Sequence, residues 1–515
     1  MLPPSVRADW ADIFMVLNEL RNALLIGLTV TLLATAAWWL DPQDSEAQLP
    51  VDGRDVPVEP QLPDDPGSEG LDAEGRPPLS VPTQPAAAIR PPSLHHILGI
   101  DTARARLGKA IPTGEGITVG HVELNHGGYM PDTRSPQFRG VTFVERSGPS
   151  KVSGHANSTA RVIYGLTGLA PGVNVVHCYG SRDWMSLGYL NAGSAQPPTG
   201  GPMRVLSHSW VSDAPNAIDV LRRIDWQVNM HDTIVCAGVN NGNQTPVPYL
   251  LGTAYNVIAV GTAQPNGSSG GYSRIETRGR SKPDIVGPRG LTSFTTPAVA
   301  ACAARLLQAA DEMTEHAHLA GKAEVIKAVL LCGAVKPDRW EQPIDRPLDE
   351  HLGAGVLHFD NSLQVLQSGP AGPGRLPRRM GWDFREIQPD QTLAYNFQTQ
   401  APMGEASIIL NWHRRITSAL ADRTSGDDSG GGSSNWYGAP RTANLNLRLI
   451  HTDDAGDEHE LAVSKSRIDN VEHIYLKNLD AGRYRLEVSR VDHVHDEPWD
   501  YALAWRVELL DEPAE

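Results

Sequence analysis

An α/β fold with a mostly parallel sheet and helices on both faces is predicted for the central part of the chain, residues 93–368. Segments of strand and helix character alternate there, as is typical of parallel sheets whose strands are joined by helices. In residues 385–515 the pattern changes to short alternating stretches separated by turn residues, which predicts an all-β sandwich. At 515 residues the chain is long enough for two or three folded units.

The elements of the central part follow from local periodicity. Strands are expected at 116–123, 173–179, 203–207, 233–237 and 257–261, and helices at 155–166, 217–230, 293–308 and 322–332. In open parallel sheets, ligands bind outside the carboxyl ends of the strands. Polar side chains that directly follow these strands are therefore the first candidates for a functional site.

The C-terminal part begins with a predicted linker, residues 369–384, which starts with Gly-Pro-Ala-Gly-Pro-Gly. Strands are then expected at 406–412, 443–450, 473–476, 484–488 and 501–507. A mobile loop is expected at 425–434, where Gly and Asp are frequent.

Residues 23–40 carry no charge and predict a transmembrane helix. At about 1.5 Å per residue they would cross most of a bilayer core of about 30 Å. Trp38 and Trp39 stand near the end of the segment, where aromatic side chains anchor a span at the interface.

The distribution of positive charge predicts the orientation of this helix. Arg7 and Arg21 precede it, and no Lys or Arg follows before Arg54. Residues 1–22 are therefore expected in the cytoplasm, and the rest of the chain in the periplasm, anchored once in a bacterial inner membrane. The alternative is secretion after signal cleavage, with Ala34-Thr35-Ala36 as the small-residue site.

Composition adds several expectations about folding and partners. Residues 41–92 are rich in Pro, Asp, Glu and Gly, which predicts a disordered linker. The net charge of −16 disfavours nucleic acid as a partner. No cofactor and no metal ligand can be assigned, and calcium is left open.

The cysteines predict buried thiols. Each of the four lies in an apolar run and none has C-x-x-C spacing, which argues against metal or redox chemistry (Cys178, Cys236, Cys302 and Cys332). Disulfides are left open for an exported domain.

Four polar residues stand at element boundaries of the central part. Glu123 ends a predicted strand and Asn240 follows another, whereas His155 and Ser293 begin helices. The start of a helix stabilises developing negative charge through its unpaired N–H groups. Singly, each residue is explained as a solvated acid, a turn, a structural histidine or a helix cap. Together they supply the acid, amide donor, base and nucleophile that acyl transfer requires.

These residues resemble the subtilisin-like serine peptidases. Lys-Pro-Asp-Ile-Val at 282–286 and Thr-Ser-Phe-Thr-Thr-Pro-Ala-Val-Ala at 292–300 are similar to the nucleophile signature of that family. Gly-Leu-Ala-Pro-Gly at 168–172 is similar to the segment after its catalytic histidine. The resemblance covers about residues 95–365, includes the order of acid, His, Asn and Ser, and implies the subtilisin-like sheet.

The resemblance implies a role for each residue. Ser293 is the nucleophile, His155 the general base and Glu123 the acid that orients the base. Asn240 is the donor of the oxyanion hole, whose removal is expected to cost about 10²–10³ in turnover.

Ser209 and Trp210 fall on the substrate-binding strand of the family. Five positions depart from the family pattern, among them Ser158 in place of a second His and Val211 in place of a Gly on the substrate strand. Glu123 stands where most members have Asp, although Glu serves the same purpose in other Ser-His hydrolases. Ala156 and Leu291 stand where the family has Gly.

The sequence therefore predicts an exported, membrane-anchored serine endopeptidase that acts on protein or peptide substrates. The alternative is an inactive relative that serves as a binding or scaffold protein on the cell surface, and an esterase is a third hypothesis. With Asp-Asn-Val-Glu-His-Ile-Tyr-Leu at 469–476 and Asp-Ala-Gly-Arg-Tyr-Arg-Leu-Glu-Val at 480–488, the last domain resembles β-sandwich modules that follow bacterial secreted peptidases. If Glu123 proves dispensable, His121 and Asp132 are the next acid-side candidates.

Overall fold

The computed structural model describes residues 93–125, 127–268, 270–376, 378–420, 436–492 and 496–510. The chain divides into two compact units, 1–88 and 89–515, and every described residue belongs to the second. The predicted segments 1–22, 23–40 and 41–92 and the loop 425–434 lie outside the described residues. Within the described part, every helix is too short or too polar to span a bilayer.

A seven-stranded parallel sheet forms the centre of the α/β part, in the order β2-β3-β1-β4-β5-β6-β9. The strands are β1 (Val119–Glu123), β2 (Thr142–Glu145), β3 (Val175–Gly180), β4 (Val205–His208), β5 (Ile234–Gly238), β6 (Ile258–Thr262) and β9 (Ile285–Gly287). The predicted parallel sheet is confirmed, although β2 and β9 were not among the predicted strands. Because β1 pairs with both β3 and β4, its last residue lies inside the carboxyl edge of the sheet and not at an outer corner.

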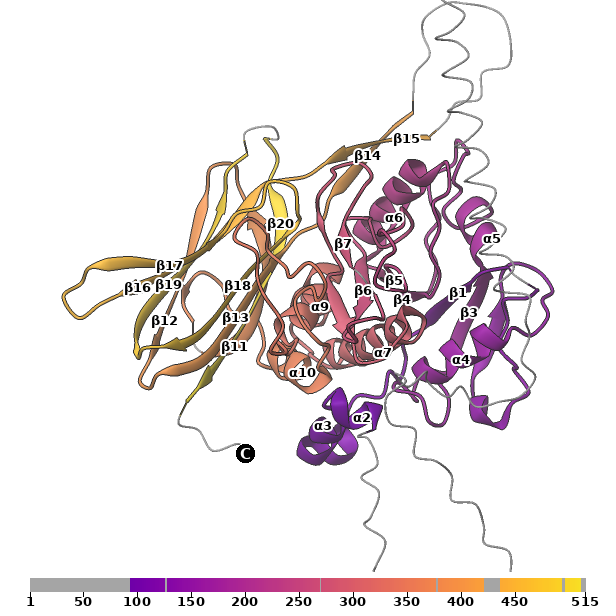
Figure 1. The fold of residues 1–515 in the computed structure, drawn as a ribbon, viewed down its shortest axis with the longest axis horizontal. Helices are drawn as coiled ribbons and strands as arrows, with labels where there is room; N and C mark the ends of the chain where they lie inside the picture. The colour runs from indigo at the N-terminus through magenta and orange to yellow at the C-terminus, as the bar shows by residue number, and fades with distance from the viewer. Residues whose placement is uncertain are drawn as a thin grey trace, which may run out of the picture. The chain divides into compact units, whose positions relative to one another are not determined.

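Helices lie on both faces of this sheet. The longer ones are α3 (Ile100–Leu107), α4 (Gly154–Ile163), α6 (Ala217–His231), α7 (Thr292–Asp311), α9 (Ala323–Cys332) and α10 (Phe359–Gln367). Shorter helices are α2 (Leu94–Ile97), α5 (Ser181–Ser186) and α8 (Ala317–Ala320). Helix α7 packs on β4, β5, β6 and β9, and Figure 1 shows α6 on the opposite side of these strands.

Two sheets form the C-terminal β-sandwich, with orders β10-β12-β19-β16-β17 and β11-β20-β13-β18. Their strands are β10 (Gly374–Arg375), β11 (Met380–Ile387), β12 (Thr392–Thr399), β13 (Met403–Asn411), β16 (Leu445–Thr452), β17 (Glu458–Ser464), β18 (Val471–Leu479), β19 (Gly482–Arg490) and β20 (Trp499–Leu509). All pairs are antiparallel except that of β10 with β12. Strand β11 begins at Met380, so residues 380–384 of the predicted linker are strand residues.

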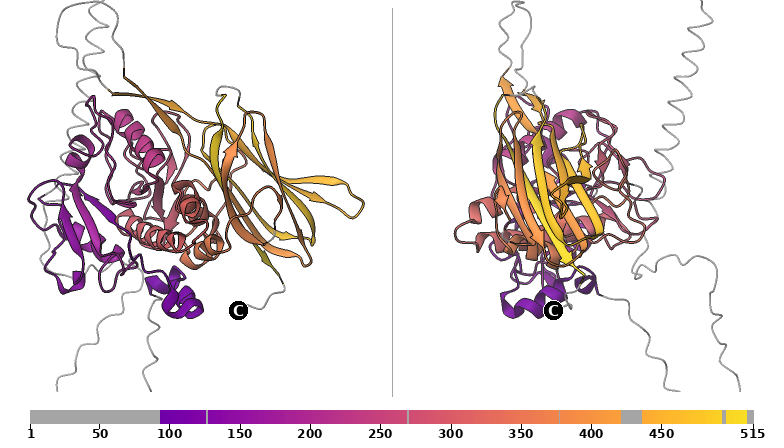
Figure 2. Two further views of the ribbon diagram at one scale, coloured as in Figure 1. Left: turned by 180° about the vertical axis from the view of Figure 1, so that it is seen from behind. Right: turned by 90° about the vertical axis from the view of Figure 1, so that its left-hand side faces the viewer.

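The sandwich packs closely on the α/β part. The four-stranded sheet lies against α9, and its strand β13 serves two cores because side chains alternate between the faces of a strand. Ile409 belongs to the apolar core of the α/β part, whereas Ile408 and Leu410 belong to the core between the two sheets. Figure 2 shows from two further sides how these strands run beside the α/β helices.

A small hairpin, β14 (Arg415–Leu420) and β15 (Trp436–Arg441), extends from the sandwich and contacts α6. Just before it, Arg414 enters the α/β part, where it is almost completely buried. Its Nε donates to Asp225 Oδ2 at 2.8 Å, and its Nη1 lies 2.6 Å from Glu276 Oε2. Loss of one partner from such a network leaves a buried charge uncompensated. Apolar packing and buried ion pairs therefore both join the two parts.

The four cysteines are free and buried, as their apolar surroundings predicted. Burial raises the pKa of the Cys302 and Cys332 thiols to about 12, so both stay protonated at neutral pH.

Candidate active site

The predicted catalytic residues come from three elements. Glu123 is the last residue of β1 at the carboxyl edge of the sheet. His155 lies in the first turn of α4 and Ser293 in the first turn of α7, and these two helices pack against each other. The parallel topology thus gathers residues that are far apart in the sequence at one edge of the sheet.

Glu123 and His155 are in direct contact. His155 Nδ1 lies 2.6 Å from Glu123 Oε2. The carboxylate is only 2% exposed, whereas the imidazole side chain is 42% exposed. Ser153 caps α4 by accepting from the Ala156 N–H at 3.2 Å, which fixes the helix start that carries His155. The imidazole is therefore held from one side by the buried acid and open to solvent on the other.

This contact shifts the pKa values of both groups. Burial alone would raise the pKa of Glu123, but hydrogen bonds from His121 and His155 outweigh it and lower the pKa to about 2. The hydrogen bond to Glu123 raises the pKa of His155 above its ordinary value of 6.5, although burial opposes the change. At neutral pH Glu123 is thus ionised and stabilises the charged form of His155.

Ser293 is nearly buried and lies beside the predicted substrate strand. Ser209, directly after β4, donates its hydroxyl hydrogen to the Ser293 carbonyl oxygen at 3.1 Å. Across the described residues, no hydrogen bond joins the His155 ring to the Ser293 hydroxyl. Such bonds are often long without substrate and tighten when it binds, so the contact between base and nucleophile stays a prediction.

The start of α7 is capped from another loop. The residue before the helix, Leu291, has no side-chain cap, and Asn241 replaces that function. Its Oδ1 accepts hydrogen bonds from both the N–H and the hydroxyl of Thr292, each at 2.9 Å. Asn241 was not among the predicted site residues, which included only its neighbour Asn240.

Asn240, the predicted oxyanion donor, lies two residues after β5 and is 2% exposed. Its Nδ2 donates to the Thr245 carbonyl oxygen at 2.7 Å, and its Oδ1 accepts from the Ser268 hydroxyl at 2.8 Å. The first bond ties the amide to its own loop, and the second ties it to the segment after β6. Its role at the oxyanion therefore stays a prediction.

Trp210 is buried in an aromatic cluster. Its ring makes an edge contact with the His208 ring, with the ring centroids 5.7 Å apart. The His208 ring makes a similar contact with the Trp184 ring, with the centroids 4.4 Å apart. Burial lowers the pKa of His208 to about 3, so this ring is neutral. Because the indole of Trp210 is buried, we expect only the backbone of this residue to contact substrate.

Two further side chains surround Glu123: His121, which the sequence suggested only as an alternative on the acid side, and Thr159, which was not predicted. His121 Nε2 lies 2.9 Å from Glu123 Oε1, and the Thr159 hydroxyl donates to the same oxygen at 2.7 Å. Spacing is the signal that points to them: residues 121 and 123 share one strand face, and 155 and 159 share one helix face. Asp132, the other alternative acid, instead accepts from the Arg134 N–H at 3.2 Å.

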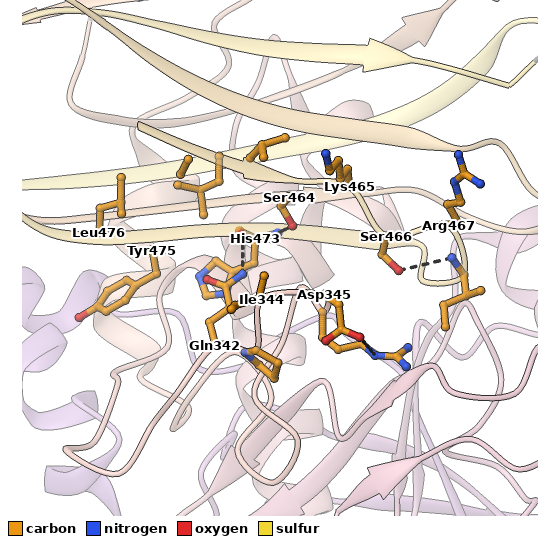
Figure 3. A pocket seen from close by; sticks show the side chains of 16 residues that line it. Gln342, Ile344, Asp345, Ser464, Lys465, Ser466, Arg467, His473, Tyr475 and Leu476 are labelled. Carbon is orange, nitrogen blue, oxygen red and sulfur yellow. Dashed lines mark hydrogen bonds and ion pairs between the residues drawn. The ribbon is translucent and has the colours of Figure 1, made fainter. Parts of the chain in front are cut away.

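A cavity of about 930 Å³ lies elsewhere, between residues 342–346 and strands β17 and β18. Figure 3 shows Ile344, His473 and Tyr475 among its lining side chains. None of the predicted catalytic residues lines it. In the described part of the chain, no three His, Cys, Asp or Glu side chains are grouped to hold a metal ion.

Comparison with known families decides what this arrangement belongs to. The sequence model of the subtilase family, Peptidase S8, matches residues 116–382. This chain belongs to the subtilase family. Membership implies the serine peptidase class, and the matched range contains all six predicted site residues. No curated protein matches this subtilase in sequence.

Several solved structures are similar to this subtilase at low identity. The patellamide maturation protease PatA is 18% identical, with 49% of this chain and 98% of that chain covered and a TM-score of 0.35. MycP1 without its N-terminal propeptide is 18% identical, with coverages of 52% and 96% and a TM-score of 0.34. Tripeptidyl peptidase 2 is 11% identical, with coverages of 69% and 40% and a TM-score of 0.27. Likenesses of this size say nothing about substrate.

Proposed function

We propose that this subtilase is a serine endopeptidase that uses Ser293, His155 and Glu123 as its catalytic triad. The observation that carries the proposal is the 2.6 Å contact between His155 Nδ1 and the buried Glu123 carboxylate. A half-exposed imidazole oriented by a buried, ionised acid is what a general base for an alcohol nucleophile requires. Ser293 supplies that alcohol at the start of α7.

The reaction begins when Ser293 Oγ attacks the peptide carbonyl carbon and His155 takes the hydroxyl proton through Nε2. Glu123 keeps Nδ1 protonated and stabilises the imidazolium that forms. The Ser293 N–H and the Asn240 amide stabilise the oxyanion. His155 then gives its proton to the leaving amine, and the peptide bond breaks to leave an acyl-enzyme.

Hydrolysis of the acyl-enzyme repeats these steps with water as the nucleophile. His155 takes a proton from water, the hydroxide attacks the ester carbon, and Ser293 leaves with the proton returned to it. An extended peptide would bind as an added strand along the backbone of Ser209 and Trp210. The hydrogen bond from the Ser209 hydroxyl to the Ser293 carbonyl oxygen supports this mode of binding.

A fluorophosphonate probe tests the proposal, because it modifies only an activated serine. We expect labelling of the wild-type chain and none of Ser293→Ala. The matched control is Ser158→Ala, which removes an exposed hydroxyl on α4 that donates to the Gly154 carbonyl oxygen of its own helix. That variant should label like wild type. A folded wild-type chain that takes up no probe would instead support the inactive scaffold.

We also propose that residues 23–40 anchor the protein in the membrane with the peptidase in the periplasm. The uncharged segment and the positive charge before it support this orientation. A periplasm-specific reporter fused after residue 60 is expected to be active, and a cytoplasm-specific reporter at the same place inactive. The reverse pattern would contradict the orientation, and an active reporter found outside the membrane fraction, in soluble form, would support signal cleavage.

A further inference from the structure

The Glu123 carboxylate is bound at both of its oxygens by histidine. Oε2 faces His155 at 2.6 Å, and Oε1 faces His121 Nε2 at 2.9 Å. Thr159 Oγ1 lies 2.7 Å from Oε1 and 2.9 Å from His121 Nε2, so it contacts both of these groups. The mechanism above uses only the Oε2 side. The Oε1 side is a second, buried arrangement around the same acid.

The orientation of the His121 ring follows from its other nitrogen. Nδ1 lies 2.7 Å from the Tyr164 hydroxyl, and both side chains are almost completely buried. Burial raises the pKa of Tyr164 well above its ordinary value, so the phenol keeps its hydrogen. In the described part of the chain that hydroxyl bonds only His121, so it must donate to Nδ1 to avoid a buried unpaired O–H. The remaining ring hydrogen is then on Nε2 and points at Glu123.

A glutamate needs such support more than an aspartate does. Its extra methylene adds a rotatable bond, and a carboxylate that swings cannot hold His155 in one position. His121 lies two residues before Glu123 on β1, so both side chains point to the same face of the sheet. A bond from this rigid, buried ring to Oε1 leaves Oε2 in one direction, toward His155.

We propose that His121 is the positioning residue of the catalytic acid, and that Tyr164 and Thr159 hold it in place. The proposal rests on the function proposed above and assigns no contact with substrate to His121. The Tyr164–His121–Glu123–His155 series thus extends from the core of the α/β part to the solvent-facing base.

Two other titratable groups near the carboxylate, His208 and Cys178, are neutral. Burial lowers the pKa of His208 on β4 and raises that of Cys178 on β3, so neither adds charge at neutral pH. The protonation of His155 therefore reports on its bond with Glu123, which is the main cause of its raised pKa. A variant that loosens Glu123 should lower the pKa of His155 toward 6.5, whereas one that only destabilises the fold should not.

The test is an NMR titration of the His155 ring in the full chain, together with peptide hydrolysis across pH. His121→Phe is expected to lower the pKa of His155 and to reduce kcat about 10- to 100-fold with little change in KM. His121→Gln keeps an N–H near the position of Nε2 and should restore part of the His155 pKa and part of kcat. Tyr164→Phe should lower the pKa of His155 and kcat as His121→Phe does, but by smaller amounts. It replaces His121→Phe in the test if that variant does not fold.

His208→Phe is the matched control, since it removes a buried histidine from the neighbouring strand that has no bond to Glu123. It should leave the titration of His155 unmoved. An unchanged His155 titration in folded His121→Phe, or an equal shift in His208→Phe, would overturn the proposal. The two inferences fail separately. If His121→Phe shifts the pKa of His155 but the wild-type chain has no peptidase activity, only the proposed function is rejected. If the wild-type chain is active but His121→Phe leaves the pKa of His155 unchanged, only the positioning role is rejected.

Discussion

Replacing His155 with alanine is expected to lower kcat/KM for a peptide substrate by about 10⁴–10⁶-fold. The physical reason is that the Ser293 hydroxyl stays protonated at neutral pH and is a poor nucleophile without a base to take its proton. The residual rate would come from binding and oxyanion stabilisation alone.

The measurement is steady-state hydrolysis of a peptide with a fluorogenic group, and circular dichroism confirms that each variant is folded. His459→Ala is the matched control, because it removes an exposed histidine in the sandwich that contacts Asp453. Its activity should equal that of wild type. Added imidazole should restore part of the His155→Ala rate by occupying the space of the missing ring. More than one tenth of wild-type activity in His155→Ala would remove this residue from the mechanism.

The second large effect is expected for Glu123→Gln, with a loss of about 10⁴ in kcat. The amide no longer carries the charge that stabilises imidazolium, and its NH₂ group favours the wrong tautomer of His155. The pKa of His155 is raised mainly by the bond to Glu123. In the variant that pKa should fall, so activity should persist to lower pH than in wild type, at a much lower level.

Glu123→Asp is the informative companion, since it introduces the acid that most family members carry. Aspartate is one methylene shorter and cannot contact both His121 and His155 from the same backbone position. We therefore expect activity about 10- to 100-fold below wild type, but above that of Glu123→Gln. Wild-type activity in both variants would show that Glu123 is not the acid, and His121 and Asp132 would then need testing.

Fold class and the order of the main elements could be predicted from the sequence because they depend on local patterns. Runs of apolar residues flanked by turn residues indicated the inner strands. Apolar spacing indicated helix α7, which was predicted at 293–308 and is observed at Thr292–Asp311. Strand β2 was missed because it is short and carries no fully buried residue, so its pattern has no apolar face. Strand β11 was missed because it directly follows a segment rich in Gly and Pro.

The candidate site was predictable to the level of which residue types stand at element ends. Ser293, His155 and Glu123 could be chosen because each stands at an element end near the carboxyl edge of a parallel sheet and because the motifs around them resemble those of a known family. Their catalytic roles remain a proposal. The capping of α7 by Asn241 was not predictable, because the bond joins residues 51 positions apart. Nothing local distinguishes Asn241 from the asparagine before it.

Local periodicity alone thus determined that this chain alternates strands and helices and then continues in β-strands. Only the folded structure decided which side chains meet around the acid, since His121 and Tyr164 lie 43 positions apart and join through strand and helix packing. The division of β13 between two cores was likewise invisible in the sequence, where Ile408, Ile409 and Leu410 are all simply apolar. The reason is physical: periodicity records which residues are buried, whereas packing and register determine against what.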